Sequence, residues 1–112
     1  DVVAVEKNPR HAAFIKQTAQ QLKVSGLKVL NLEVRSFLKL ANREFSLVFA
    51  DPPYDLPWLA DIPNLIFESK AVNEISLVVV EHPGTYDFSK HTNFVRLAKY
   101  GKVNFSFFRI KK

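Results

Sequence analysis

The sequence contains no cysteine and no methionine, and its three glycines are isolated from one another. The absence of cysteine excludes a disulfide scaffold, a thiolate metal site and a cysteine nucleophile. The longest apolar runs, such as Leu77 to Val80, are far shorter than the ~20 residues that span a bilayer. The sequence also lacks the basic cluster followed by an apolar segment that is typical of a signal peptide. These absences predict a cytoplasmic protein without a membrane partner.

Histidine is scarce as well. His11, His82 and His91 lie far apart in the sequence and show no metal-ligand spacing. We therefore expect no metal site and no catalytic histidine.

The length and composition predict a single globular domain over residues 1–112. Of these 112 residues, 47% are hydrophobic and 24% are charged. The net charge of +5 is concentrated at one end, because no acidic residue follows Asp87 whereas seven basic residues do. Such a one-sided field suits a polyanionic partner. The other interpretation is a solvated edge hairpin whose lysines deter pairing between sheet edges.

Apolar runs without alternation predict strands that are buried on both faces. Helical patterns separate them, and Asn8-Pro9 is a typical helix start. Gly26 is expected to end that first helix in the left-handed conformation, and Ser36 to cap a short second one. The turn Gly101-Lys102 predicts an antiparallel hairpin. The expected strands are Asp1–Val5, Leu27–Leu32, Phe45–Ala50 and Ile75–Val80, with hairpin strands Phe94–Tyr100 and Val103–Ile110.

This alternation predicts an α/β fold with a mostly parallel sheet, helices on both sides and a C-terminal antiparallel hairpin. A third helix within residues 56–69 is expected to have Pro63 near its first turn and to bury Leu65, Ile66 and Phe67. Ligands of open sheets bind at the carboxyl ends of the strands. The acidic residues that close the four apolar strands should therefore converge on one rim; they are Glu6, Glu33, Asp51 and Glu81.

The tetrapeptide Asp51-Pro-Pro-Tyr54 directly follows the third of these strands. An amine on an aromatic ring is a poor nucleophile, because its lone pair is delocalised into the ring. Acceptors aimed at its two hydrogens localise that pair on nitrogen as a methyl group arrives, and Asp51 and the Pro52 carbonyl would be those acceptors. Pro52 and Pro53 keep the backbone out of a helix, and Tyr54 offers a face for an extruded base. The alternative interpretation is an ordinary turn.

The tetrapeptide, a DPPY motif, resembles the signature of methyltransferases that act on exocyclic amino nitrogens. Read end to end, the chain resembles the bacterial small-subunit ribosomal-RNA guanine-N2 methyltransferase family. The segments that carry this resemblance are Val5–Asn8, Arg35–Leu38, Phe49–Tyr54, Val78–His82 and the closing hairpin at Tyr100-Gly101. The resemblance implies a Rossmann-like methyltransferase fold, S-adenosylmethionine as cofactor and a guanine of ribosomal RNA as substrate, presented on the small ribosomal subunit.

The resemblance also implies roles for individual residues. Glu6, next to Lys7, would hold the ribose of the cofactor, and Glu33 and the backbone at Val34 would hold its adenine. The target base would lie on Asp51–Tyr54, with Asp51 also bordering the cofactor. From the residues alone, Glu6 is equally an acid that favours a helix start, and Glu33 equally an exposed acid.

The sequence departs from the family in two respects. The family usually carries Asp where Glu33 stands, which weakens the inferred adenine contact. More seriously, the chain has no glycine-rich loop and no strand before Asp1–Val5 that could lead into one. In the family that first strand lies between the strands expected here at Val2–Val5 and Phe45–Ala50. We therefore expect the chain to be the C-terminal part of a longer methyltransferase and to be inactive alone.

Two other classes of function compete with this interpretation. The same chemistry could act on DNA adenine or on a protein glutamine, although the glutamine enzymes favour Asn where Asp51 stands. A non-catalytic RNA-binding module would instead use the basic end and its aromatic rings as stacking platforms. Those rings are at Phe94, Tyr100, Phe105, Phe107 and Phe108, and in a hairpin beside a buried sheet several of them would belong to the core.

Overall fold

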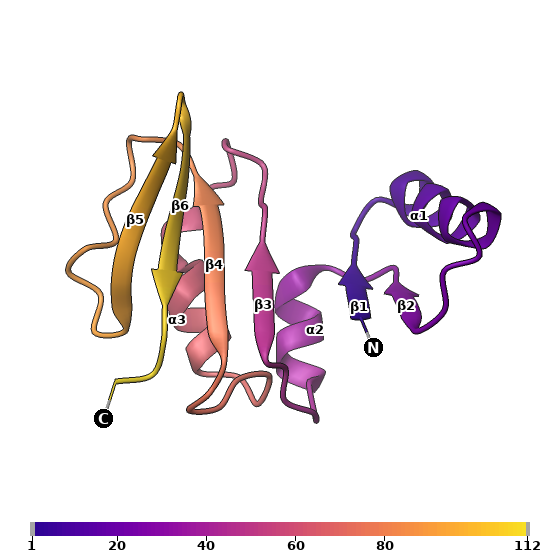
Figure 1. The fold of residues 1–112 in the computed structure, drawn as a ribbon, viewed down its shortest axis with the longest axis horizontal. Coiled ribbons are helices and arrows are strands. Elements are labelled where there is room, and N and C mark those ends of the chain that lie inside the picture. Colours follow the sequence, from indigo (N-terminus) through magenta and orange to yellow (C-terminus); the bar gives the residue numbers. More distant parts are fainter. Residues whose placement is uncertain (1, 112) are drawn as a thin grey trace. The chain divides into compact units, whose positions relative to one another are not determined.

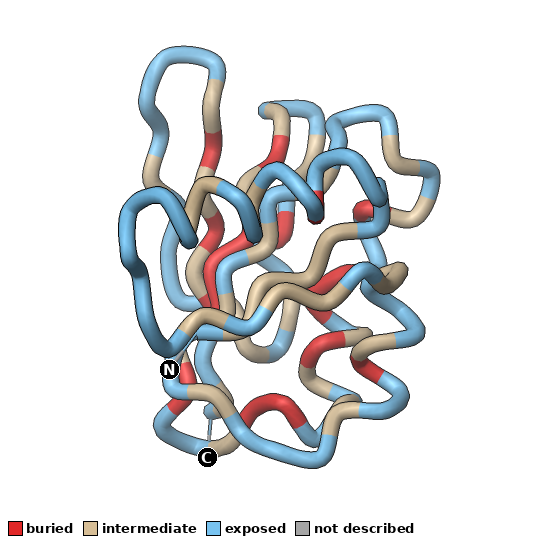
Figure 2. The backbone as a smooth tube through the Cα atoms, turned by 90° about the vertical axis from the view of Figure 1, so that its right-hand side faces the viewer, coloured by how far each residue is buried: buried red, intermediate tan, exposed pale blue. Residues whose placement is uncertain are grey.

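A computed structural model describes residues 2–111 and divides the chain into two compact units. The first unit ends at Leu40 and the second begins at Ala41. Buried residues, coloured red in Figure 2, lie mainly in the second unit, and only Ala12 and Leu38 are buried within residues 2–40. The main hydrophobic core therefore belongs to the second unit.

The first unit contains β1 (Val2–Val5), α1 (Pro9–Gln21), β2 (Leu27–Leu30) and α2 (Val34–Leu40). β1 and β2 pair in parallel along their whole length. The side chain of Asn8 accepts hydrogen bonds from the amides of Arg10 and His11, at 2.9 and 3.2 Å. Pro9 occupies the first turn, where its missing amide costs nothing. The predicted start of this helix is confirmed.

The end of α1 differs from the prediction. Lys23, and not Gly26, adopts the left-handed conformation after the helix, with a φ of 56°. The Lys23 amide donates to the Gln20 carbonyl at 3.1 Å, and the Val24 amide donates to the Ala19 carbonyl at 2.9 Å. This Schellman arrangement satisfies carbonyls that the helix end would otherwise leave unpaired. Gly26, with a φ of 77°, lies directly before β2 instead.

The boundaries around α2 also differ from the prediction. β2 ends at Leu30, and α2 begins before Ser36, which is not its cap. Glu33 takes the capping position instead: its carbonyl accepts from the Phe37 amide, and its carboxylate accepts from the Arg35 amide, both at 3.0 Å. A carboxylate at this position satisfies an amide that has no partner within the helix.

The second unit contains β3 (Leu47–Ala50), the short 3₁₀ helix η1 (Leu59–Asp61), α3 (Ile62–Phe67), β4 (Leu77–His82), β5 (Phe94–Tyr100) and β6 (Val103–Phe108). The sheet order is β3-β4-β6-β5, with β3 parallel to β4 and the other pairs antiparallel (Figure 1). The predicted hairpin is confirmed, and Gly101 adopts the positive φ of 63° in its turn. The fold is α/β with a mixed sheet.

The two faces of this sheet differ in burial. Val78, Val80 and Phe108 are fully buried on one face, which α3 contacts through the rings of Phe67 and Phe108, 6.3 Å apart. On the opposite face, Phe49 of β3 is 55% exposed. The core of the second unit therefore lies between the sheet and α3.

α3 buries a different set of residues from the one predicted. Ile66 is buried as expected, but Leu65 and Phe67 are only half-buried, and Ile62 and Pro63 are buried in their place. The helix begins one residue before Pro63, so positions 62, 63 and 66 share the inward face at helical spacing. Within residues 2–111, every helix is too short or too polar to span a bilayer.

The strands form two separate ladders within residues 2–111, and not the single sheet that the sequence predicted. Among the strands that the structure describes, β1 pairs only with β2, and β3 pairs only with β4. Each of these two strands thus has one edge without a strand partner among the described residues. The strand that the family resemblance places between these two segments stays a prediction.

Phe108→Ala should destabilise the second unit, because this ring is fully buried against Phe67, Phe88 and His91. Truncating a buried aromatic side chain lowers the free energy of unfolding by about 3–5 kcal/mol. Ile75→Ala is the matched control, since Ile75 is 71% exposed and such a truncation costs less than about 0.5 kcal/mol. Urea unfolding followed by circular dichroism measures both values. Equal losses in the two variants would show that Phe108 lies outside the core.

Candidate functional site

The motif Asp51–Tyr54 lies at the carboxyl end of β3. The strand ends at Ala50, and irregular backbone follows it. Two successive prolines explain this ending, because neither carries an amide donor and each restricts the residue before it. The Leu56 amide donates to the Pro53 carbonyl at 3.0 Å, so the motif runs into a turn. Asp51 and Tyr54 are both exposed, and Tyr54 keeps 41% of its surface accessible to solvent.

A side-chain hydrogen bond links this motif to the end of β4. The Tyr54 hydroxyl donates to Glu81 Oε2 at 3.1 Å. Loss of solvent contact raises the pKa of Tyr54, and the bond to Glu81 and the negative charges of Glu81 and Asp51 raise it further. Two of the acids predicted to converge, Asp51 and Glu81, therefore act on the same hydroxyl. The sequence predicted their common rim but not this hydrogen bond.

His82 anchors the end of β4 on the opposite face. Its ring is 1% exposed, and its Nε2 and Nδ1 lie 2.7 Å from Ser106 Oγ and 2.8 Å from the Pro83 carbonyl oxygen. Because a carbonyl only accepts, Nδ1 must donate to it, and Nε2 of the neutral ring then accepts from the Ser106 hydroxyl. Both ring nitrogens are thus used in fixing the strand end. The sequence predicted no catalytic role for His82.

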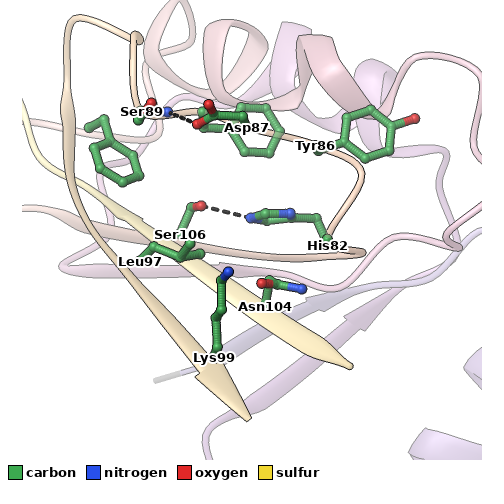
Figure 3. Close-up of a pocket in the computed structure, with 11 residues that line it drawn as sticks. His82, Tyr86, Asp87, Ser89, Leu97, Lys99, Asn104 and Ser106 are labelled. Atoms are coloured by element: carbon green, nitrogen blue, oxygen red, sulfur yellow. Dashed lines mark hydrogen bonds between the residues drawn. The ribbon is translucent and has the colours of Figure 1, made fainter. Parts of the chain in front are cut away.

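A cavity of about 500 Å³ lies beside this anchored histidine, between the loop that follows β4 and the β5–β6 hairpin. Figure 3 shows the His82–Ser106 bond in its floor, with Asn104 and Lys99 on the hairpin side and Tyr86 on the loop side. The polar groups of the floor satisfy one another. The hydrogen bonds of His82 in this floor fix the end of β4.

In the first unit, Glu6 and Lys7 follow β1. The Asn31 side-chain amide donates to the Glu6 and Lys7 carbonyls at 2.9 and 2.8 Å. Asn31 directly follows β2, so a side chain at the end of β2 fixes the segment that follows β1. The Glu6 carboxylate lies 3.1 Å from Nδ1 of His11, at the start of α1. Sequence reasoning missed Asn31, although a polar residue directly after an apolar strand is the signal that singled out Glu6.

Glu33 and Val34 form the start of α2. Slight burial raises the pKa of Glu33, but hydrogen bonds from the Arg35 amide and guanidinium and the Arg35 charge bring the pKa below its usual value. Glu33 Oε1 receives both of these bonds, the one from Arg35 Nε at 3.2 Å. Val34 is the first helical residue, where the amide has no intrahelical acceptor.

The structure groups the predicted residues by unit. Glu6, Lys7, Glu33 and Val34 belong to the first unit, and Asp51–Tyr54 with Glu81 belong to the second. No glycine-rich turn is present, since Gly26, Gly84 and Gly101 lie in separate connections. Among residues 2–111, no three acidic or histidine side chains are grouped in a way that could hold a metal ion.

Comparison with known proteins finds similar proteins over most of the chain. The model of a family described as conserved hypothetical protein 95 matches residues 1–109. The uncharacterised methylase RP545 of Rickettsia prowazekii is 26% identical over 96 residues, which cover 80% of this chain and 41% of the relative. The chain thus spans less than half of that curated relative.

Solved structures match the fold. A proposed methylase of Haemophilus influenzae is 24% identical and gives a TM-score of 0.82, covering 97% of this chain and 71% of its own. A proposed rRNA methylase of Clostridium thermocellum is 9% identical and gives a TM-score of 0.67, covering 99% and 73%. The chain therefore has the α/β fold of methyltransferase structures.

The Tyr54–Glu81 hydrogen bond should be measurable in the ionisation of Tyr54, whose pKa lies above its usual 10.0. Glu81→Gln should lower that pKa, because the substitution removes the nearby negative charge. Near-ultraviolet pH titrations isolate this ring as the difference between the protein and its Tyr54→Phe variant, with Tyr100→Phe as the control ring. An unchanged Tyr54 pKa in the Glu81→Gln variant would contradict the hydrogen bond.

Proposed function

The chain belongs to the family described as conserved hypothetical protein 95, and on this premise we propose that the whole protein is a methyltransferase. Its reaction would transfer a methyl group from S-adenosylmethionine to the exocyclic amine of a guanine in ribosomal RNA. One observation carries the proposal: Asp51–Tyr54 lies at the carboxyl end of β3, with the Tyr54 hydroxyl bound to Glu81 at the end of the paired strand β4.

The chemistry follows from the acceptors of this motif. The Asp51 carboxylate and the Pro52 carbonyl accept hydrogen bonds from the two hydrogens of the amine, which concentrates its lone pair on nitrogen. Asp51 can then take up the proton that the methylated amine loses. Tyr54 supplies an exposed ring on which a base removed from its stack can rest. Pro53 keeps the backbone between them out of a helix.

The cofactor assignment is supported at the ribose and adenine ends. A carboxylate directly after a strand accepts hydrogen bonds from ribose hydroxyls, and Glu6 has this position in a segment that Asn31 fixes through the Glu6 and Lys7 carbonyls. Glu33 and the Val34 amide would receive the adenine at the start of α2. When bound, S-adenosylmethionine supplies a methyl group that its sulfonium already activates, so the protein mainly positions the reactants.

The methionine end of the cofactor lacks a matching feature in this chain. The three glycines lie in separate connections and form no glycine-rich turn. We place that contact in a part of the whole protein outside these 112 residues. The edges of β1 and β3 without a described strand partner support the same assignment.

A nucleic-acid substrate is what the charge distribution favours. Arg96 and Lys99 of β5 and Lys102 of the following turn are exposed on the hairpin. The Arg96 guanidinium lies 4.1 Å from the centre of the Phe107 ring, which holds it in place on the sheet. A basic hairpin beside an acidic rim is suited to binding phosphates around a target base.

A purely RNA-binding role is less well supported. It requires the hairpin aromatics to serve as exposed stacking platforms. Phe108 is fully buried, and Phe94, Phe105 and Phe107 are half-buried. These rings belong mostly to the core, which leaves Tyr100 as the exposed ring of that set.

Methylation assays with labelled S-adenosylmethionine test the proposal on the whole protein. Small ribosomal subunits, duplex DNA and a release factor serve as alternative substrates, and we expect label on the N2 atom of a guanine in the ribosomal RNA. Tyr54→Ala should reduce turnover by about 10- to 100-fold, because stacking on the reactive base is lost, while RNA affinity changes little. Tyr100→Ala, at the exposed tyrosine of the hairpin, is the comparison variant for the binding-module alternative.

The outcomes separate the three classes of function. Label in DNA or release factor alone would overturn the RNA assignment. Equal losses of turnover and RNA affinity in Tyr54→Ala would favour the binding module.

A further inference from the structure

We propose that Glu81 determines which base the enzyme accepts, by receiving the N1–H of guanine while Asp51 receives the exocyclic amine. This inference rests on the proposed function and adds a specificity-determining residue to it. The Watson–Crick edge of guanine carries two adjacent donors, N1–H and the N2 amine. Adenine presents an acceptor at its own N1, so the same carboxylate would repel it.

Strand register brings the two acidic residues to the same level of the sheet. Ala50 of β3 pairs with Val80 of β4 in a parallel ladder, so the next residues along the two strands are Asp51 and Glu81. Neighbouring strands lie about 4.8 Å apart, so side chains from both strands can reach one base. Tyr54 confirms their proximity, since its hydroxyl is bound to Glu81 and lies in the field of both charges.

Glu81 retains capacity to accept further hydrogen bonds. An ionised carboxylate has about four acceptor positions, and the Tyr54 hydroxyl occupies one of them on Oε2. Glu81 is a partner in neither the Glu6–His11 pair nor the Glu33–Arg35 pair. Its charge is therefore available to a donor on the substrate.

The surroundings of Glu81 favour a flat, apolar ligand. Phe105 of β6 is its partner in the ladder, and the Phe105 ring lies 6.3 Å from that of Phe49 and 6.0 Å from that of Tyr100. On the opposite face of the strand, His82 is fixed by its two hydrogen bonds. The carboxylate thus projects from a fixed strand end beside aromatic rings, where an unsatisfied base atom is strongly disfavoured.

The test compares guanine with 2-aminopurine at the target position of an RNA substrate, using the whole protein. 2-Aminopurine keeps the methyl-accepting amine but has an acceptor at N1. The wild-type kcat/KM should be about 10- to 100-fold higher for guanine. Glu81→Gln should reduce this ratio to below about 3-fold, because its amide can either donate or accept.

Tyr54→Phe is the matched control. It removes the hydroxyl that binds Glu81 but keeps the carboxylate, so turnover changes while the base ratio stays at the wild-type value. If Glu81 only positioned Tyr54, then Glu81→Gln and Tyr54→Phe would alter turnover alike and both would keep the ratio, which would overturn the inference. A wild-type ratio near one would overturn it as well, and this result does not depend on the folding of any variant.

The failure of this inference can be distinguished from failure of the proposed function. Methylation of ribosomal RNA with an unaltered base ratio in Glu81→Gln contradicts only the role of Glu81. Absence of wild-type methylation on any RNA contradicts the proposed function and, with it, the inference. Should Glu81→Gln prove inactive on both bases, Glu81→Asp, which retains a carboxylate, must keep a preference for guanine, and loss of that preference would count against the proposal.

Discussion

The parallel pairing of β3 with β4 is the constraint on which the site depends. Because Ala50 lies opposite Val80, Asp51 follows the last residue of β3 at the level where Glu81 continues β4. The prolines after Asp51 then turn the backbone so that the Tyr54 hydroxyl reaches Glu81. A shift of one residue in this register would direct Glu81 to the opposite face, where the core lies.

That register is in turn fixed by burial on one face of the sheet. Val78, Val80 and Phe108 are fully buried, and Ser76, also fully buried, donates to the Phe45 carbonyl at 2.6 Å. A slip would expose these apolar side chains and break that buried bond, at a cost of several kcal/mol. His82 adds a second anchor at the other end of β4. β4, which carries Glu81, is therefore fixed at both ends by groups that take no part in the proposed reaction.

Much of this arrangement could be predicted from the sequence, since it follows from local patterns. Apolar runs located the strands, Asn8-Pro9 located a helix start, and Gly101 located the hairpin turn. The errors arose where more than one residue could take the same structural position. Lys23 took the left-handed position assigned to Gly26, because two main-chain hydrogen bonds close the helix there. Contacts between distant segments, such as Asn31 with Glu6 and Tyr54 with Glu81, leave no periodic signal and required the structure.

The central claim is that the target base is bound at Asp51–Tyr54, at the end of β3. The most direct measurement is a structure of the whole protein with S-adenosylhomocysteine and an RNA that contains the methylated guanine position. The account predicts an extruded guanine stacked on Tyr54, with its exocyclic nitrogen about 3 Å from the Asp51 carboxylate. A base bound on the β5–β6 hairpin instead, away from Asp51 and Tyr54, would contradict it.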